Sequence, residues 1–200
     1  MGRLVRRLGA IAAIAVMVLA AGLLANASVL INITQSGGNV DVTATGSLDL
    51  TGATFDHPQN YSTGIIPGGS NWYIALGTTP GMDWYQLTSV NLPYGTSGSY
   101  YTSGLTSGDA FSIWGYTGST PLVGLPTGYT SGSPISADMT LSGETIAGMT
   151  LIPGTYTFTI PNDTIILDIG GSSVPESGTL VMFGSGIIGL AGILRRKINL

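Results

Sequence analysis

Residues 40–45 read Val40-Asp41-Val42-Thr43-Ala44-Thr45, and the fold class of this 200-residue chain follows from their alternation. Apolar side chains occupy every second position, which is typical of a β-strand with one buried and one solvent-facing side. A helix would instead need apolar residues three and four positions apart. We therefore predict a half-buried strand here.

Short runs of the same kind recur along the chain, separated by turn formers such as Pro67-Gly68-Gly69 and Pro153-Gly154. Glycine supplies positive φ and proline presets the first central residue of a turn. No stretch between residues 28 and 173 has a sustained helical period. The expected strands cover residues 28–34, 40–45, 47–50, 72–76, 84–92, 111–116, 137–141, 155–160 and 164–169.

Many short strands at this spacing predict an all-β fold, an antiparallel β-sandwich formed by residues 28–173. A barrel is the less favoured alternative. The segment from Tyr94 to Gly108 is rich in Gly, Ser, Thr and Tyr, and we expect it to form a long loop.

The six basic residues of the chain all lie near its ends, where each trio borders an apolar run. Positive charge beside such a run stays on the cytoplasmic side of a membrane, so the pattern predicts that the intervening segment is exported. The two trios are Arg3, Arg6 and Arg7, and Arg195, Arg196 and Lys197.

The first apolar run, about residues 8–24, has the features of a secretory signal peptide. Ala25 and Ala27 are the small residues that a signal peptidase requires. We therefore predict a signal peptide over residues 1–27, with cleavage before Ser28. An uncleaved anchor helix is the alternative.

The second apolar run, residues 177–194, carries no charge and ends at Arg195-Arg196-Lys197. A helix of about 18 residues spans roughly 27 Å, close to the thickness of about 30 Å of a bilayer's hydrocarbon core. We predict a C-terminal transmembrane helix whose membrane stop is this basic cluster.

A short motif, Val174-Pro175-Glu176, precedes this run, and Gly189-Leu190-Ala191-Gly192 lies inside it. With the basic cluster, residues 174–200 resemble the PEP-CTERM sorting signal of Gram-negative bacteria, although Ser177 stands where a second proline is usual. The resemblance implies that an exosortase, a membrane-embedded enzyme, recognises the motif, cuts nearby and passes the exported domain to the cell envelope or the surrounding polysaccharide. An ordinary membrane anchor is the alternative.

The exported segment is itself similar to a recurring small passenger domain of this class. The similarity rests on the Tyr-x-Ser-Gly turn at Tyr129-Thr130-Ser131-Gly132 and on the hairpin corner at Pro153-Gly154-Thr155-Tyr156. It implies an all-β passenger and no particular activity.

Acidic residues dominate the charge of this segment. All ten Asp and Glu residues except Glu176 lie between residues 28 and 173, where there is no Lys or Arg. Nucleic acid and anionic lipid have charge of the same sign, so we exclude both as partners. The chain also has no Cys, so its stability must rest on apolar burial and backbone pairing.

Few residues of the segment are suited to catalysis, because its only His is His57. Adjacent side chains rarely hydrogen-bond to each other, so we expect His57 of Asp56-His57-Pro58 to be an exposed loop residue. Asp163 and Asp168 bracket one expected strand and are the weak candidates for cation binding, but no calcium-loop pattern is present. We therefore predict no enzyme activity, no cofactor and no metal site.

Aromatic residues are the main candidates for binding, because exposed rings stack on sugars and Tyr hydroxyl groups hydrogen-bond to them. We assign the Trp residues to the core, and Tyr100 and Tyr101 in the expected loop to glycan contact. Thr155, Thr157 and Thr159 share one face of a strand, as in ice-binding surfaces, but no sequence repeat extends that face.

Together these patterns predict an exported, non-enzymatic protein of the cell surface or extracellular matrix, with a structural role in exopolysaccharide or biofilm. The expected partners are signal peptidase, an exosortase-type enzyme, extracellular polysaccharide, and the membrane before processing. A lectin-like carbohydrate-binding module is the alternative. Ice binding and polysaccharide hydrolysis are less favoured.

Overall fold

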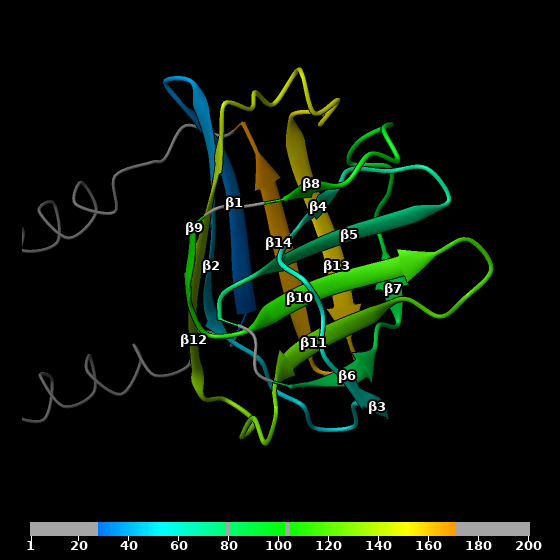
Figure 1. The fold of residues 1–200 in the computed structure, drawn as a ribbon. Coiled ribbons are helices and arrows are strands. Elements are labelled where there is room, and N and C mark those ends of the chain that lie inside the picture. The colour runs from blue at the N-terminus through cyan, green and yellow to red at the C-terminus, as the bar shows by residue number, and fades with distance from the viewer. Residues whose placement is uncertain (1–27, 79–80, 103–104, 171–200) are drawn as a thin grey trace, which may run out of the picture. The chain divides into compact units, whose positions relative to one another are not determined.

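The computed structural model describes residues 28–78, 81–102 and 105–170, which form strands, turns and loops (Figure 1). Within these ranges there is no helix of the length and apolar character needed to cross a membrane. The predicted signal peptide and the predicted C-terminal helix lie outside the described residues, as does the motif at residues 174–176.

The described strands form two sheets of seven strands each. Sheet A has the order β7 (Ser89–Val90), β13 (Gly154–Ile160), β14 (Asp163–Ile169), β1 (Ser28–Ser36), β2 (Asn39–Ser47), β12 (Pro134–Ser142) and β9 (Leu105–Gly108). Sheet B has the order β3 (Phe55–Gln59), β6 (Met82–Gln86), β11 (Leu122–Pro126), β10 (Phe111–Tyr116), β5 (Asn71–Leu76), β4 (Gly64–Ile66) and β8 (Tyr101–Thr102).

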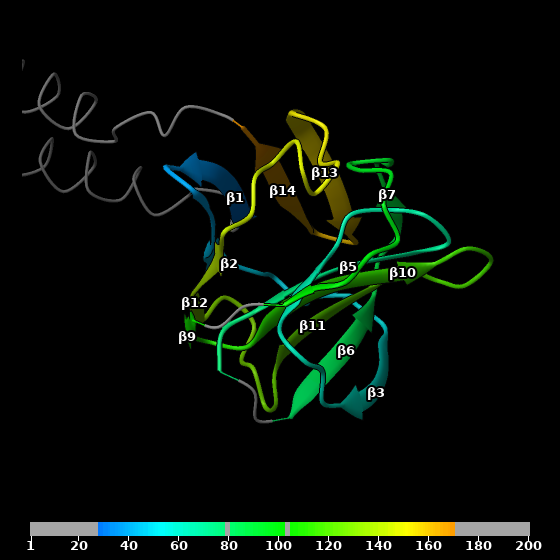
Figure 2. The ribbon, with the colours of Figure 1, turned by 45° about the horizontal axis from the view of Figure 1, so that its top comes forward.

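The hydrophobic core lies between the two sheets, which Figure 2 shows as separate layers. The predicted alternation of residues 40–45 is confirmed in β2, where Val40, Val42 and Ala44 are fully buried. Sheet B contributes alternate residues in the same way, among them Ile74 of β5 and Ile113 of β10. Each fully buried aliphatic side chain contributes about 1.5–3 kcal/mol through apolar burial. The all-β prediction is thus confirmed for the described residues, as two packed sheets.

The centre of sheet A differs from the predicted antiparallel arrangement. Strands β1 and β14 run parallel, with Val29 opposite Ile165 and Ile33 opposite Ile169, whereas the other pairings among the described strands are antiparallel. The two strands are far apart in the sequence, so no tight turn forces them into opposite directions. Both ends of the described segment therefore lie in the middle of one sheet.

The strand predicted for residues 84–92 is wrong in one respect, because the structure divides it between the two sheets. β6 belongs to sheet B and β7 to sheet A. Between them, the Leu87 amide donates to the Pro121 carbonyl and the Thr88 amide donates to the Thr159 carbonyl, each at 2.8 Å. The chain thus passes from one sheet to the other within two residues.

The segment expected to be a long loop, residues 94–108, contains the short strands β8 and β9. Tyr94 at its start is fully buried, and its hydroxyl donates to the Ile66 carbonyl at 3.2 Å. Residues 48–50, also predicted as a strand, follow β2 without joining a sheet.

Candidate aromatic binding site

The described part of the chain carries an aromatic pocket of about 410 Å³ on the outer face of sheet B. Five of its lining side chains are Tyr or Trp, and the others are neutral. The residues of this aromatic pocket are Tyr61, Ser62, Ile66, Asn71, Tyr73, Tyr100, Trp114 and Tyr116.

Two neighbouring strands supply half of the pocket. Because Trp72 and Ile74 of β5 belong to the core, the alternating Asn71 and Tyr73 face the other way. The same alternation in β10 turns Trp114 and Tyr116 outward. The antiparallel register then sets Tyr73 opposite Trp114 and Asn71 opposite Tyr116.

Tyr61, between β3 and β4, is the centre of an aromatic cluster on this face. Its ring centroid lies 4.9 Å from that of Trp84, 5.3 Å from that of Tyr73 and 6.4 Å from that of Trp114. Offset and edge contacts at such distances are favourable and restrict the rings. Tyr61 is therefore held by three aromatic neighbours.

Tyr100, just before β8, lines the pocket and is 43% exposed. Its hydroxyl donates to the Thr63 carbonyl at 2.8 Å, and its ring centroid lies 6.1 Å from that of Tyr73. The ring lies over Gly64, where a Cβ would be 2.6 Å from Cε2 of Tyr100. Gly64 is thus needed for this position of the ring.

The polar groups of the pocket are uncharged. Trp114 Nε1 donates to Asn71 Oδ1 at 3.0 Å, which fixes the orientation of the Asn71 amide. Burial, with the neighbouring Tyr100 and Tyr61, raises the pKa of Tyr73, so its hydroxyl stays neutral. The described lining residues include no Asp, Glu, Lys, Arg or His. Such a surface suits a neutral ligand with both apolar faces and hydroxyl groups.

The two predicted glycan contacts lie in different surroundings. Tyr100 lines the aromatic pocket, whereas Tyr101 packs against the core and its hydroxyl donates to the Gly148 carbonyl at 3.4 Å. Of the Trp residues assigned to the core, Trp72 and Trp84 are buried, but Trp114 lines the pocket.

Sequence reasoning did not single out Tyr61, Ser62, Ile66 and Asn71 as site residues. One signal was present in the sequence, since Asn71-x-Tyr73 and Trp114-x-Tyr116 each place two polar or aromatic residues on the same face of a strand. The contact of Tyr61 with these residues depends on how its loop folds back over the sheet.

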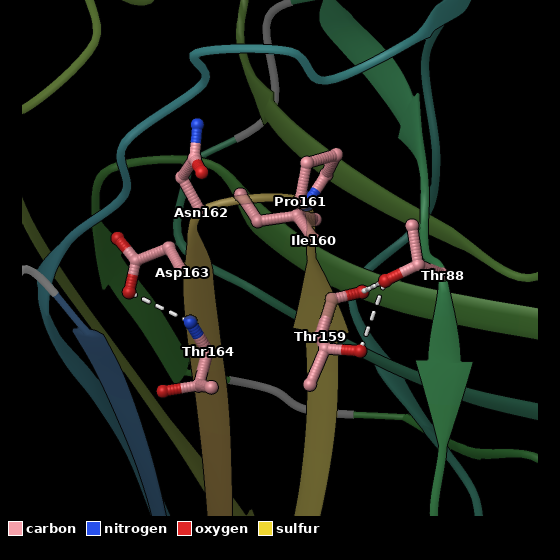
Figure 3. Close-up of a pocket in the computed structure, with 7 residues that line it drawn as sticks. All are labelled: Thr88, Thr159, Ile160, Pro161, Asn162, Asp163 and Thr164. Carbon is pink, nitrogen blue, oxygen red and sulfur yellow. Dashed lines mark hydrogen bonds between the residues drawn. The ribbon is translucent and has the colours of Figure 1, made fainter.

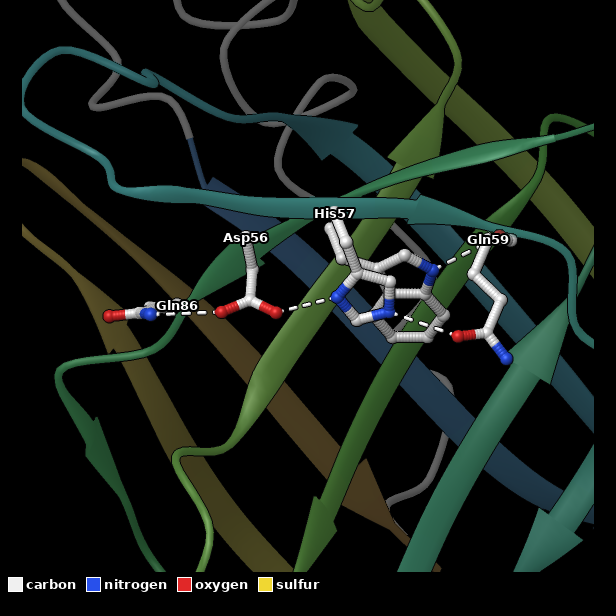
Figure 4. Close-up of polar contacts among 5 residues, drawn as sticks. Asp56, His57, Gln59 and Gln86 are labelled. Atoms are coloured by element: carbon white, nitrogen blue, oxygen red, sulfur yellow. Dashed lines mark hydrogen bonds and ion pairs between the residues drawn. The ribbon is translucent and has the colours of Figure 1, made fainter.

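The expectation for His57 is wrong, because this residue lies in β3 and its ring is hydrogen-bonded (Figure 4). Its Nδ1 lies 2.5 Å from Asp56 Oδ2, its Nε2 lies 3.0 Å from Gln59 Oε1, and its ring stacks on that of Trp84. In a regular strand adjacent side chains point to opposite faces, but the register of β3 shifts between Phe55 and Pro58.

The Asp56–His57 pair does not form a catalytic arrangement in the structure. Gln86 Nε2 donates to Asp56 Oδ1 at 2.9 Å, and this bond and the one from His57 lower the pKa of Asp56. Both ring nitrogens of His57 are already engaged, so neither is free to take a proton from a nucleophile. The network instead ties the edge strand β3 to β6.

The weak candidates for cation binding, Asp163 and Asp168, are not brought together, because they lie on opposite faces of β14. Asp163 lines a hollow of about 500 Å³ at the β13–β14 turn, with Thr88, Thr159, Ile160, Pro161, Asn162 and Thr164 (Figure 3). Its carboxylate accepts bonds from the amides of Asp49 and Thr164, each at 2.7 Å. No group of three potential metal ligands occurs among the described residues.

Comparison with known proteins found no match: no family model, no curated protein and no solved structure is significantly similar to this chain. The function is therefore inferred from the pocket and from the sequence.

Proposed function

We propose that this chain is an exported protein of the cell surface or extracellular matrix that binds polysaccharide in the aromatic pocket. The observation that carries the proposal is the set of five Tyr and Trp rings gathered on one face of sheet B. Sugar rings have apolar C–H faces that stack on aromatic rings, and hydroxyl groups that bond to phenols and amides. The volume of about 410 Å³ lies within the usual range for small-ligand sites.

Binding without hydrolysis is the activity that these residues support. Glycoside hydrolysis commonly needs two carboxyl groups on either side of the scissile bond. The described lining residues of the aromatic pocket include none. A pocket that holds sugar without cleaving it is consistent with a structural role in exopolysaccharide or biofilm.

Export and sorting are the second part of the proposal, and they rest on the sequence. The basic residues at both ends and the signal-peptide pattern of residues 1–27 support export by way of signal peptidase. The resemblance of residues 174–200 to the PEP-CTERM signal supports release by an exosortase. Delivery to surrounding polysaccharide would bring the pocket to its ligand.

The residues of the strand beside Thr155, Thr157 and Thr159 do not favour ice binding. Thr155, Thr157 and Thr159 lie opposite Asp168, Ile166 and Thr164 of β14. A charged and an aliphatic residue therefore interrupt the Thr surface at the adjacent strand. We do not propose this function.

Two exposed aromatic residues offer a matched test of the pocket. Tyr116 lines it and is 52% exposed, whereas Phe55 lies outside it and is 51% exposed. We expect Tyr116→Ala to weaken binding three- to tenfold, because a lost ring stack is worth about 0.5–1.5 kcal/mol. We expect Phe55→Ala to bind as the unmodified protein does.

Affinity electrophoresis against a panel of neutral and anionic polysaccharides, followed by calorimetry with the best ligand, measures these effects. The proposal is refuted if no polysaccharide in the panel retards the protein. It is equally refuted if Tyr116→Ala and Phe55→Ala change the affinity to the same extent.

A further inference from the structure

The hydroxyl group of Tyr73 is buried and has no hydrogen-bond partner among the described residues. The residue is 3% exposed, and among the described residues only Asn32 Oδ1, on sheet A, is in the same condition. A buried hydroxyl without a partner loses its hydration and gains nothing in return. A Phe at this position would fill the same space without that cost.

The place of this hydroxyl links it to the pocket. Tyr73 points away from the core and lines the aromatic pocket. Its ring centroid lies 5.3 Å from that of Tyr61 and 6.1 Å from that of Tyr100. An unpartnered polar group in a pocket suited to sugars indicates that its partner is a ligand.

We propose that the Tyr73 hydroxyl is the polar contact that selects a neutral hexose unit, and that Tyr100 is a movable cover over it. This inference rests on the proposed function and names the ligand class and the selecting residue. A sugar hydroxyl both donates and accepts, so it satisfies a phenol that has no other partner.

Tyr100 is suited to moving, and Tyr61 is not. Tyr100 is 43% exposed, and its hydroxyl is held by hydrogen bonds with the Thr63 carbonyl and the Ser62 side chain, in the loop before β4. Rotation of this side chain loses these bonds and uncovers Tyr73. Tyr61 contacts three aromatic rings, so it stays as the fixed wall.

The charges of the segment and of the pocket predict that the bound sugar is neutral. An anionic sugar needs a cation, and the segment 28–173 has no Lys or Arg. A cationic amino sugar needs a carboxylate, and no Asp or Glu is among the described lining residues. The pocket therefore fits a hexose without a charged substituent.

The test uses protein purified after expression of the full-length chain. Titration calorimetry measures its affinity for cellohexaose, mannohexaose and laminarihexaose, and for hexagalacturonate as the anionic counterpart. We expect Tyr73→Phe to weaken binding of the preferred neutral hexaose at least tenfold, while its Tm equals or exceeds that of the unmodified protein. Tyr85→Phe removes a hydroxyl from a residue that packs against the core, outside the pocket, and should leave the affinity unchanged. Stopped-flow Trp fluorescence measures the association rate, which should rise severalfold in Tyr100→Phe, because this variant lacks the hydroxyl whose hydrogen bonds hold the cover in place.

The outcomes separate the two levels of the proposal. If the unmodified protein binds none of the neutral hexaoses, the proposed function itself fails. If it binds one and Tyr73→Phe binds equally well, only the role of Tyr73 is overturned. Tighter binding of hexagalacturonate would overturn the assignment of a neutral sugar as the ligand. An unchanged association rate in Tyr100→Phe would overturn the proposal that Tyr100 is a movable cover.

Discussion

At the scale of single residues, the carboxylates of this domain compensate for the absence of Lys and Arg. Asp49 accepts hydrogen bonds from the Thr51 amide at 2.9 Å and from Ser131 Oγ at 3.0 Å. Asp163 accepts in turn from the amide of Asp49. Hydrogen bonds to an ionised acceptor are stronger than neutral ones, so these acids fix the chain after β2 without an ion pair.

The same bonds make a prediction about acid stability. They hold the pKa of Asp49 below its usual range, so the folded state favours the carboxylate more than the unfolded state does. This stabilisation is present above the ordinary Asp pKa of about 4 and is lost as the pH falls through the lower folded value. We expect the Tm of Asp49→Asn to fall less between pH 7 and pH 3 than the Tm of the unmodified protein does.

Thermal scans at several pH values measure the slope of Tm against pH for each protein. Glu144→Gln is the control, because no hydrogen bond of the Glu144 side chain is seen among the described residues, and its slope should match that of the unmodified protein. Equal slopes for Asp49→Asn and the unmodified protein would contradict the assignment.

At the scale of strands, local alternation predicts an element well when one of its faces meets solvent. Residues 40–45 were predicted as a strand and lie in β2, where buried residues alternate with exposed or half-buried ones. β11 was missed, because Leu122, Val123 and Leu125 are all buried and a run covered on both faces has no period of two.

The candidate site was predictable by residue type and not by position. Abundant aromatic residues, and the place of Tyr100 and Tyr101 in an expected loop, indicated a binding surface. The pairing of Tyr73 with Trp114 depends on the register between β5 and β10, which are far apart in the sequence. No local pattern encodes such a register, so the pocket emerges only in the folded sheet.

The central parallel pair predicts where sheet A is most sensitive to truncation. Ile31 of β1 is fully buried between Leu167 of β14 and Ala44 of β2, whereas its neighbour Leu30 is 41% exposed. We expect Ile31→Ala to lower the free energy of unfolding by about 2–5 kcal/mol through lost burial and a residual cavity. Leu30→Ala should cost less than about 1 kcal/mol. Urea unfolding monitored by Trp fluorescence measures both, and similar losses would show that β1 is not a central strand.

At the scale of the whole molecule, charge is unevenly distributed, and in the proposed function it divides the chain into terminal segments handled at the membrane and a middle segment that is exported. The segment 28–173 holds nine acidic residues and no basic one, apart from His57. The six basic residues at the ends serve topology in this scheme, and the pocket makes no use of them. Removing both ends would leave the proposed binding function intact.

This division makes a prediction about the mature protein. In a host with an exosortase-type enzyme, signal peptidase should cut before Ser28, and the sorting enzyme should remove the residues after about Gly178. The mature chain then carries none of its six basic residues, which intact-mass measurement detects directly. A Pro175→Ala, Glu176→Ala variant should keep its C-terminal residues, because the resemblance to the sorting signal implies that the enzyme recognises this motif. Retention of Arg195-Arg196-Lys197 in the unmodified protein would refute the sorting proposal and leave the aromatic pocket to be judged by its own binding tests.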